Sequence, residues 1–263
     1  MSAPLLVLDR VTMQFGGLKA VSDLSLTIGD GEMVGLIGPN GAGKTTVFNV
    51  ITGVYTPTAG TIRFAGRQTS GLKPNAIARA GITRTFQNIR LFGTRTCRDN
   101  VAIGAHQHAG AGIGSAVLQN GAWKRDEADM RAKADELLAL LGLTAWADTL
   151  ASELPYGQQR RLEIARALAG RPKLLLLDEP AAGLNPQESD ELMHVIDGLR
   201  ARFQLGILLI EHDMKVVMGI CGRISVLDYG VKIAEGSAQE IRSNPKVIEA
   251  YLGEEVVSGD AGH

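Results

Sequence analysis

A glycine-rich segment in the first fifth of the chain carries the clearest chemistry in the sequence. Its residues are Gly38, Pro39, Asn40, Gly41, Ala42, Gly43, Lys44, Thr45 and Thr46. Glycines let the main chain turn so that successive N–H groups face bound phosphates. Lys44 would reach the β- and γ-phosphates of a nucleotide, and the Thr45 hydroxyl would ligate Mg²⁺. An apolar run at 33–37 and a helical pattern at 45–52 supply the strand and helix that this phosphate-binding pattern requires.

Two adjacent carboxylates form a second candidate site. Asp178 and Glu179 directly follow four leucines, which predict a buried strand. Ligands bind at the carboxyl ends of strands in open α/β sheets. We expect Asp178 to hold Mg²⁺ through water and Glu179 to act as general base on an attacking water. A charged residue often merely ends a strand, but together with the glycine-rich segment the pair predicts binding and hydrolysis of Mg·ATP.

The elements that must position these residues alternate between strands and helices. Apolar runs predict strands at 5–13, 24–28, 33–37, 61–64, 173–177, 206–210, 224–227 and 231–234. The first two predict an antiparallel opening with a turn at 15–17. Asn185 as cap, Pro186 at the first position and Glu188 in a capping box predict a helix. Its apolar stripe is Leu192, Val195, Ile196 and Leu199. Strands separated by helices predict an α/β fold with a parallel sheet.

The middle of the chain has a different pattern. Strand signals fade after about residue 88, and Ala134, Leu137, Leu138 and Leu141 follow helical spacing. We expect one nucleotide-binding domain, with a core at 1–87 and 166–253 and a helical subdomain inserted at 88–165. Residues 104–122 are rich in Gly and Ala and predict a loop, and the polar residues 254–263 predict a tail.

Composition excludes several classes of function. The chain has 263 residues, 45% of them hydrophobic, which is enough for a sizeable core. The formal net charge of −1 gives no general attraction to nucleic acid. No apolar run approaches the roughly 18 residues that span a bilayer, so any membrane association is expected to be peripheral. Cys97 and Cys221 lack metal spacing and are expected to be reduced thiols.

The order of further motifs resembles the ATP-binding cassette (ABC) proteins over residues 5–253. Phe15 resembles the aromatic residue that stacks on adenine, with a turn aromatic closing the core as the alternative. Gln87 resembles the Q-loop glutamine, which contacts Mg²⁺ and the attacking water. His212 resembles the switch histidine, which would contact the γ-phosphate and orient Glu179. The resemblance implies a P-loop ABC ATPase core with an antiparallel β subdomain and an inserted helical subdomain.

Residues 154–159 resemble the ABC signature, which is usually Leu-Ser-Gly-Gly-Gln. Pro155 replaces the serine and has neither a main-chain N–H nor a hydroxyl, and Tyr156 replaces a glycine. The resemblance therefore implies a narrower role, in which Gly157 and Gln158 contact ATP held by the opposite subunit. Residues 182–185 resemble the D-loop, which crosses the dimer interface. One phosphate loop and one signature per chain imply a dimer with two shared sites.

Several unusual variants of the family motifs occur together and indicate one branch of the family. Residues 155–165, 179–186, 211–214 and 244–253 are similar to the ATP-binding subunit of branched-chain amino-acid importers of the Liv type. The resemblance implies a second ABC ATPase subunit, identical or different, two membrane permeases and an extracytoplasmic solute-binding protein. It places the chain peripherally at the cytoplasmic face of the inner membrane. The alternatives are a lipid-extraction or export ATPase, a non-transport ABC ATPase, and a module that binds ATP without turnover.

The residues after Gln87 are the candidates for contact with a permease. Ile89, Leu91 and Phe92 are apolar beside a polar loop and would line a groove for a coupling helix. Ordinary packing within the subdomain is the alternative for each. If the groove has this role, Leu91→Asp is expected to uncouple transport and to leave basal ATP hydrolysis intact.

Overall fold

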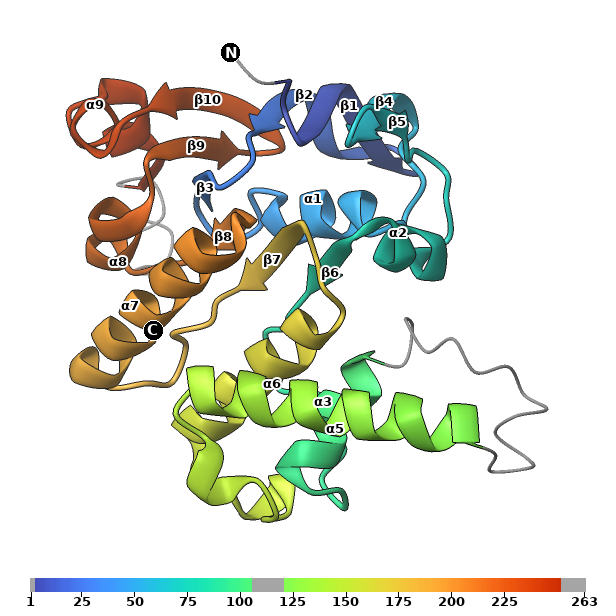
Figure 1. Cartoon of the computed structure of the whole chain (residues 1–263). Helices are drawn as coiled ribbons and strands as arrows, with labels where there is room; N and C mark the ends of the chain where they lie inside the picture. Colours follow the sequence, from blue (N-terminus) through green and yellow to red (C-terminus); the bar gives the residue numbers. More distant parts are fainter. Residues whose placement is uncertain (1–2, 106–120, 252–263) are drawn as a thin grey trace.

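The computed structural model describes residues 3–105 and 121–251, in which the strands form two sheets (Figure 1). The smaller sheet is antiparallel, in the order β2-β1-β4-β5. Its strands are β1 (Leu6–Phe15), β2 (Leu18–Ile28), β4 (Ala59–Phe64) and β5 (Arg67–Gln68). The predicted antiparallel opening is confirmed. However, β2 begins at Leu18 rather than residue 24, because the pairing with β1 continues to the two-residue turn Gly16–Gly17.

The larger sheet carries the candidate site. Its order is β10-β9-β3-β8-β7-β6, with every neighbouring pair parallel except β10 with β9. The strands are β3 (Met33–Ile37), β6 (Ile82–Arg84), β7 (Leu174–Asp178), β8 (Gly206–Ile210), β9 (Arg223–Asp228) and β10 (Val231–Gly236). The sequence pattern did not predict β6, which is only three residues long. The central strands are buried throughout, as expected when helices or a second sheet cover both faces.

Alternate residues of these strands belong to two hydrophobic clusters. Leu175 and Leu177 point to one side of β7, and Leu174 and Leu176 to the other. The first cluster includes the helical subdomain. The second includes the antiparallel sheet, with α1 packed between the two sheets (Figure 1). Strands buried on both faces hold their ends rigidly, which suits them to position a site at the sheet edge.

The helices account for most of the remaining described chain. They are α1 (Lys44–Ile51), α2 (Pro74–Ala80), α3 (Cys97–Ala105), α5 (Gly121–Leu140), α6 (Tyr156–Ala169), α7 (Pro186–Phe203), α8 (Met214–Ile220) and α9 (Ala238–Arg242), with short 3-10 turns η2 (Thr144–Trp146) and η3 (Ala151–Glu153). The predicted loop at 104–122 is wrong at both ends, because 104–105 belong to α3 and 121–122 to α5. Its residues 106–120, and the predicted tail at 254–263, lie outside the described residues.

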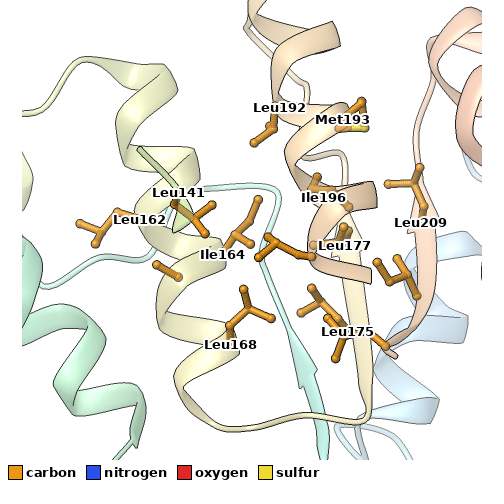
Figure 2. Packing of buried hydrophobic residues seen from close by; sticks show 14 of the residues in the cluster. Leu141, Leu162, Ile164, Leu168, Leu175, Leu177, Leu192, Met193, Ile196 and Leu209 are labelled. Atoms are coloured by element: carbon orange, nitrogen blue, oxygen red, sulfur yellow. The ribbon is translucent and has the colours of Figure 1, made fainter. Parts of the chain in front are cut away.

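Helix α6 connects the helical region to the core. It packs with α3 and α5, and it runs through the expected subdomain boundary at residue 165 without interruption. Figure 2 shows Leu141, Leu162 and Leu168 in one packed cluster with Leu175 and Leu177 of the sheet. The predicted stripe Ala134, Leu137, Leu138 and Leu141 is buried. The signature-like helix therefore shares a hydrophobic core with strand β7.

In the part of the chain that the structure describes, no helix is long and apolar enough to cross a bilayer.

Candidate active site

The glycine-rich loop joins β3 to α1, as the sequence predicted. Gly38 has φ 148°, and a Cβ there would lie 2.0 Å from the carbonyl oxygen of Leu227. Gly43 has φ 100°, and its Cβ would lie 2.4 Å from the carbonyl oxygen of Ala20. Only glycine tolerates both the conformation and the close approach. The loop thus lies close against β9 on one side and against β2 on the other.

Lys44 lies across the loop that precedes it. Its Nζ donates hydrogen bonds to the carbonyl oxygens of Gly38 (2.5 Å) and Pro39 (2.8 Å), and only 7% of the residue is exposed. The ammonium group is therefore held over the loop at the N-terminus of α1. A positive charge and a helix N-terminus together make this a site for anionic phosphate groups.

A cleft with a volume of about 400 Å³ opens at this loop. It gathers ten of the predicted site residues: Asn40, Gly41, Ala42, Gly43, Lys44, Thr45, Thr46, Gln87, Glu179 and His212. Four residues that sequence reasoning missed complete the lining, namely Leu18, Lys19, Ala20 and Tyr229. Segments from β2, the Q-loop, the end of β7, the end of β8 and the β9–β10 turn thus converge on the phosphate loop.

The carboxylate of Glu179 is held on both oxygens. Oε2 accepts a hydrogen bond from Nε2 of Gln87 at 2.7 Å, and Oε1 lies 2.5 Å from Nε2 of His212. The Glu179 side chain is 13% exposed and that of His212 is 47% exposed, so the group faces the cleft. The three residues predicted to be catalytic come from widely separated segments and meet here.

The backbone at Glu179 is in an unusual conformation. Its φ is 49°, in the left-handed region that a residue with a side chain rarely adopts. The N–H of Glu179 donates to the carbonyl oxygen of Ile210 at 2.9 Å, which holds this turn to the end of β8. Left-handed residues of this kind cost about 1–3 kcal/mol and cluster at active sites. The conformation aims the Glu179 side chain back over the phosphate loop.

A buried glutamate, to which the sequence analysis assigned no role, connects the chain after Glu179 with that at His212. Glu211 accepts hydrogen bonds from the main-chain N–H of Ala181 (2.7 Å) and of His212 (3.2 Å). Burial raises the pKa of this carboxyl, and the two N–H donors oppose that rise. The residue is only 5% exposed. Its two hydrogen bonds connect the segment after Glu179 to the main chain of His212.

Asp178 is paired with an arginine that was also missed. Its Oδ2 lies 2.6 Å from Nη2 of Arg84, and both side chains are nearly buried. Nη1 of Arg84 donates to Oδ1 of Asn49 at 2.6 Å. Arg84 ends β6, the short strand that the pattern did not predict, so nothing in the sequence pointed to this pair.

Phe15 does not line the cleft, although it was expected to bind adenine. Its ring packs edge-on against Tyr55, with centroids 5.1 Å apart, and the residue is 41% exposed. Tyr229, which is 87% exposed, lines the cleft instead, from a turn where its φ is 43°. The role of Phe15 stays a prediction.

Gly157 and Gln158 lie in the first turn of α6 and do not line the cleft of their own chain. Pro155 is the N-cap of that helix and makes no side-chain cap. The first turn faces the D-loop, since a Cβ on Gly157 would lie 3.6 Å from Leu184. The D-loop leads into α7, where Asn185 and Glu188 form the predicted capping box.

The oxygen donors near the phosphate loop are of the kind that a magnesium nucleotide site uses. Within residues 3–105 and 121–251, no cluster of three or more His, Cys, Asp or Glu side chains could hold a metal ion. Mg²⁺ in nucleotide sites takes few protein ligands and completes its shell with water and phosphate oxygens. Thr45 lines the cleft and Asp178 ends β7, so a hydroxyl and a carboxylate are present at the edge of the sheet where such a site would form.

Comparison with known proteins agrees with this geometry. A family model described as "ABC transporter" matches residues 21–182, and one described as "Branched-chain amino acid ATP-binding cassette transporter" matches residues 231–257. The chain is 50% identical, over 97% of its length and 100% of the relative's, to the high-affinity branched-chain amino acid transport ATP-binding protein LivG of Salmonella typhimurium strain LT2.

Solved structures lead to the same family. An ADP-bound ATP-binding cassette of an ABC transporter matches with a TM-score of 0.84 and 32% identity, covering 96% of this chain and all of that one. A dimeric cassette in a post-hydrolysis state with ADP and Pi matches with a TM-score of 0.74 and 27% identity, covering 89% of this chain and 98% of that one. The P-loop, the carboxylates after β7 and these matches together show that the chain belongs to the ABC transporter family, as an ATP-binding cassette ATPase.

Proposed function

We propose that this chain is the ATP-hydrolysing subunit of a membrane importer for branched-chain amino acids. The observation that carries the proposal is the position of the Glu179 carboxylate, held between Gln87 and His212 at the edge of the phosphate-loop cleft. A carboxylate fixed beside a phosphate site is suited to accept a proton from an attacking water. The 50% identity to LivG supports the importer assignment.

Each group of the site then has a role in hydrolysis. The phosphates of ATP bind the N–H groups of residues 40–46, and Lys44 neutralises their charge. Mg²⁺ would be held by Thr45 and Gln87 and, through water, by Asp178, and would offset charge on the phosphate oxygens. We assign the general base to Glu179 and the γ-phosphate contact to His212. The adenine contact of Phe15 is part of the same proposal.

We further propose that two ATPase subunits share their sites. Gly157 and Gln158 lie in the first turn of α6 and do not line the cleft of their own chain, which supports a role toward ATP on the opposite subunit. The dimeric cassette with ADP and Pi among the structural relatives supports the same arrangement. ATP that contacts both subunits would favour the closed dimer, and hydrolysis would release it.

The permeases would dock on a second cleft, which lies beside the Q-loop. It has a volume of about 590 Å³ and is lined by Thr83, Arg90, Leu91, Phe92, Ile103, Gly104, Arg166, Ala167 and Gly170. Leu91 packs partly into the hydrophobic cluster, whereas Phe92 is 49% exposed. Two of the three residues expected to form a coupling groove therefore line one cleft, and Phe92 is the more accessible of them.

The proposed complex is tested by co-purification from the native cell. The tagged full-length chain is solubilised in mild detergent, and the proteins that accompany it are identified. We expect two permeases and a second ATPase subunit, at the cytoplasmic face of the inner membrane, with a solute-binding protein that reaches the permeases from outside. Recovery of membrane partners that take up no branched-chain amino acid would leave the ATPase standing and reject the substrate. Recovery with ribosomes or DNA, and no membrane protein, would reject the importer.

A further inference from the structure

The signature-like helix α6 is hydrogen-bonded to the main chain of the Q-loop through two buried polar side chains. Arg160 donates from Nη1 to the carbonyl oxygen of Phe86 (2.9 Å) and from Nη2 to that of Gln87 (2.6 Å). Glu163, one turn further along the helix, accepts from the N–H groups of Phe86 and Arg90, each at 3.4 Å. Arg160 is 3% exposed and Glu163 is 2% exposed, and Nη1 of Arg160 lies 3.6 Å from Oε2 of Glu163. A buried pair with such hydrogen bonds fixes one segment against another.

Arg160 has a third partner at the start of the same helix. Its Nη2 donates to the hydroxyl oxygen of Tyr156 at 2.9 Å, and its guanidinium lies 5.4 Å from the centroid of the Tyr156 ring. Tyr156 stands where the signature usually has glycine, so this contact is a feature of the unusual signature. Two separate nitrogens of the planar arginine fork reach the two carbonyls and the hydroxyl, whereas the three donors of an ammonium group all lie on one atom and do not match this geometry.

The ring of Tyr156 then reaches the D-loop. A Cβ placed on Gly183 would lie 3.0 Å from Cε1 of Tyr156 and 3.4 Å from its Cζ. Gly183 also has φ 81°, so both its conformation and its neighbour favour glycine. The D-loop turn is thus packed against the aromatic ring, with Leu184 beside Gly157 next to it.

We propose that Tyr156 and Arg160 are positioning residues that join the Q-loop, the signature turn and the D-loop of one subunit into a single mechanical unit, which we call the relay. Gln87 makes the unit relevant to hydrolysis, because Arg160 holds its carbonyl while its side chain holds Glu179. When Gly157 and Gln158 contact ATP on the opposite subunit, a shift of α6 changes the position of Gln87 against the base of its own site. This communication between the two ATP sites rests on the proposed function, whereas the contacts within the subunit do not.

The test uses the full-length chain with two conservative variants and one matched control. Tyr156→Phe keeps the ring over Gly183 and removes only the hydroxyl. Arg160→Lys keeps the charge and removes the fork. Arg161→Lys makes the same change at the next residue of α6, whose side chain contacts Leu141 and Glu191 instead of the Q-loop.

Hydrogen exchange decides whether the relay exists, with or without hydrolysis. We expect amides in both 86–90 and 181–185 to exchange faster in Tyr156→Phe and Arg160→Lys than in the wild type, at an unchanged melting temperature. Arg161→Lys is expected to match the wild type. Unchanged exchange in 181–185 for both relay variants would overturn the proposal, as would an equal effect of Arg161→Lys. A wild type that hydrolyses no ATP would count against the proposed function, while the exchange result would still decide the relay.

Steady-state kinetics decide whether the relay positions the base. We expect kcat for ATP to fall about tenfold in Arg160→Lys and about threefold in Tyr156→Phe, with KM within about twofold of the wild type. The double variant is expected to lose no more than Arg160→Lys alone, because both changes break one unit. Wild-type kcat in Arg160→Lys, or fully multiplicative losses in the double variant, would show that these residues do not act together on the site.

Discussion

His212 Nε2 lies 2.5 Å from Oε1 of Glu179, although the two residues follow different strands of the parallel sheet. The other oxygen of Glu179 accepts from Gln87, so the carboxylate is oriented from two sides before any nucleotide is considered. A base that is already oriented needs little reorganisation when the reaction starts. A change at Glu179 should therefore lower the rate of hydrolysis much more than it lowers the affinity for ATP.

Glu179→Gln is expected to lower the rate of phosphate release at least a hundredfold and to leave ATP affinity within a few-fold of the wild type. The amide keeps the size of the side chain but cannot accept the proton of the attacking water, and loss of a general base typically costs 10²–10⁴ in rate. Phosphate release under saturating ATP measures the first quantity, and titration with a fluorescent ATP analogue measures the second. Glu127→Gln, on the far helix α5, is the control and should behave as the wild type. Equal phosphate release by Glu179→Gln and wild type would remove Glu179 from the role of base.

The same carboxylate shows what the sequence could predict. The phosphate loop and the Asp178–Glu179 pair were predictable because their chemistry requires adjacent residues of fixed type in a fixed order. Gln87 and His212 came only from resemblance to a family, since a Gln or His after a strand has no distinctive local pattern. The structure places residues 40–46 of the phosphate loop on one cleft together with Gln87, Glu179 and His212, and Asp178 precedes Glu179 at the end of β7.

Most of the features that the sequence analysis missed were missed for the same physical reason. Arg84, Glu211 and Tyr229 matter through partners far away in the chain, and no periodicity or spacing encodes such a partner. Strand β6 was missed because three residues are too few to show alternation. Phe15 was assigned by its place before the glycine-rich segment, yet its described packing partner is Tyr55 from the chain after α1. Except for β6, contacts across the fold rather than the local pattern decided these cases.

Phe92→Asp is expected to abolish coupled transport and to keep basal ATP hydrolysis within about twofold of the wild type. Phe92 is more exposed than Leu91 or Ile103, the other large apolar residues of the cleft proposed for the permease, and an added carboxylate would disfavour burial of this surface against a partner. It is a sharper probe than Leu91→Asp, because Leu91 packs into the core and its change would also disturb folding. Uptake and ATP hydrolysis are measured on the same membranes that contain the complex.

The control for this surface is Ile248→Asp, an exposed apolar residue after α9 and outside the cleft. It should retain transport. Parallel loss of uptake and hydrolysis in Phe92→Asp, accompanied by a lower melting temperature, would indicate a folding defect instead of a lost contact with the permease.

Above pH 9, Cys221 is expected to make the stability of the protein fall with pH. Burial raises the pKa of this thiol to about 12, and its Sγ would lie 3.2 Å from a Cβ on Gly35, which shows how tightly it is packed. Between the ordinary pKa near 9 and the folded value, the unfolded chain loses the proton while the native chain keeps it. Stability is therefore fully present below pH 9 and decreases by up to about 1.4 kcal/mol per pH unit above it.

Urea denaturation of wild type and Cys221→Ala at pH 8 and pH 10 measures this contribution. The variant removes the thiol, so its free energy of unfolding should fall less steeply over the interval than that of the wild type. Other groups titrate equally in both proteins and cancel in the difference. Identical slopes would mean that the thiol ionises as readily in the folded protein as in the unfolded one.

The buried pair of Arg84 and Asp178 allows a last prediction, in which the loss of both partners is less harmful than the loss of one. Arg84→Met leaves the Asp178 carboxylate buried without its charged partner, and breaking such a pair costs about 3–5 kcal/mol. Asp178→Asn removes the opposite charge and leaves the guanidinium with the hydrogen bond to Asn49 and the rings of Phe48 and Phe86 beside it. In Arg84→Met/Asp178→Asn no unpaired charge remains, so part of the lost stability should return.

Urea denaturation of the wild type, the two single variants and the double variant gives the coupling free energy directly. A double variant as unstable as the sum of the single changes would show that the two side chains act independently. In that case Arg84 would not be what holds Asp178 at the end of β7. Both variants that lack Asp178 should also lose Mg²⁺-dependent hydrolysis, whereas Arg84→Met should retain part of it, because the carboxylate assigned to magnesium is still present.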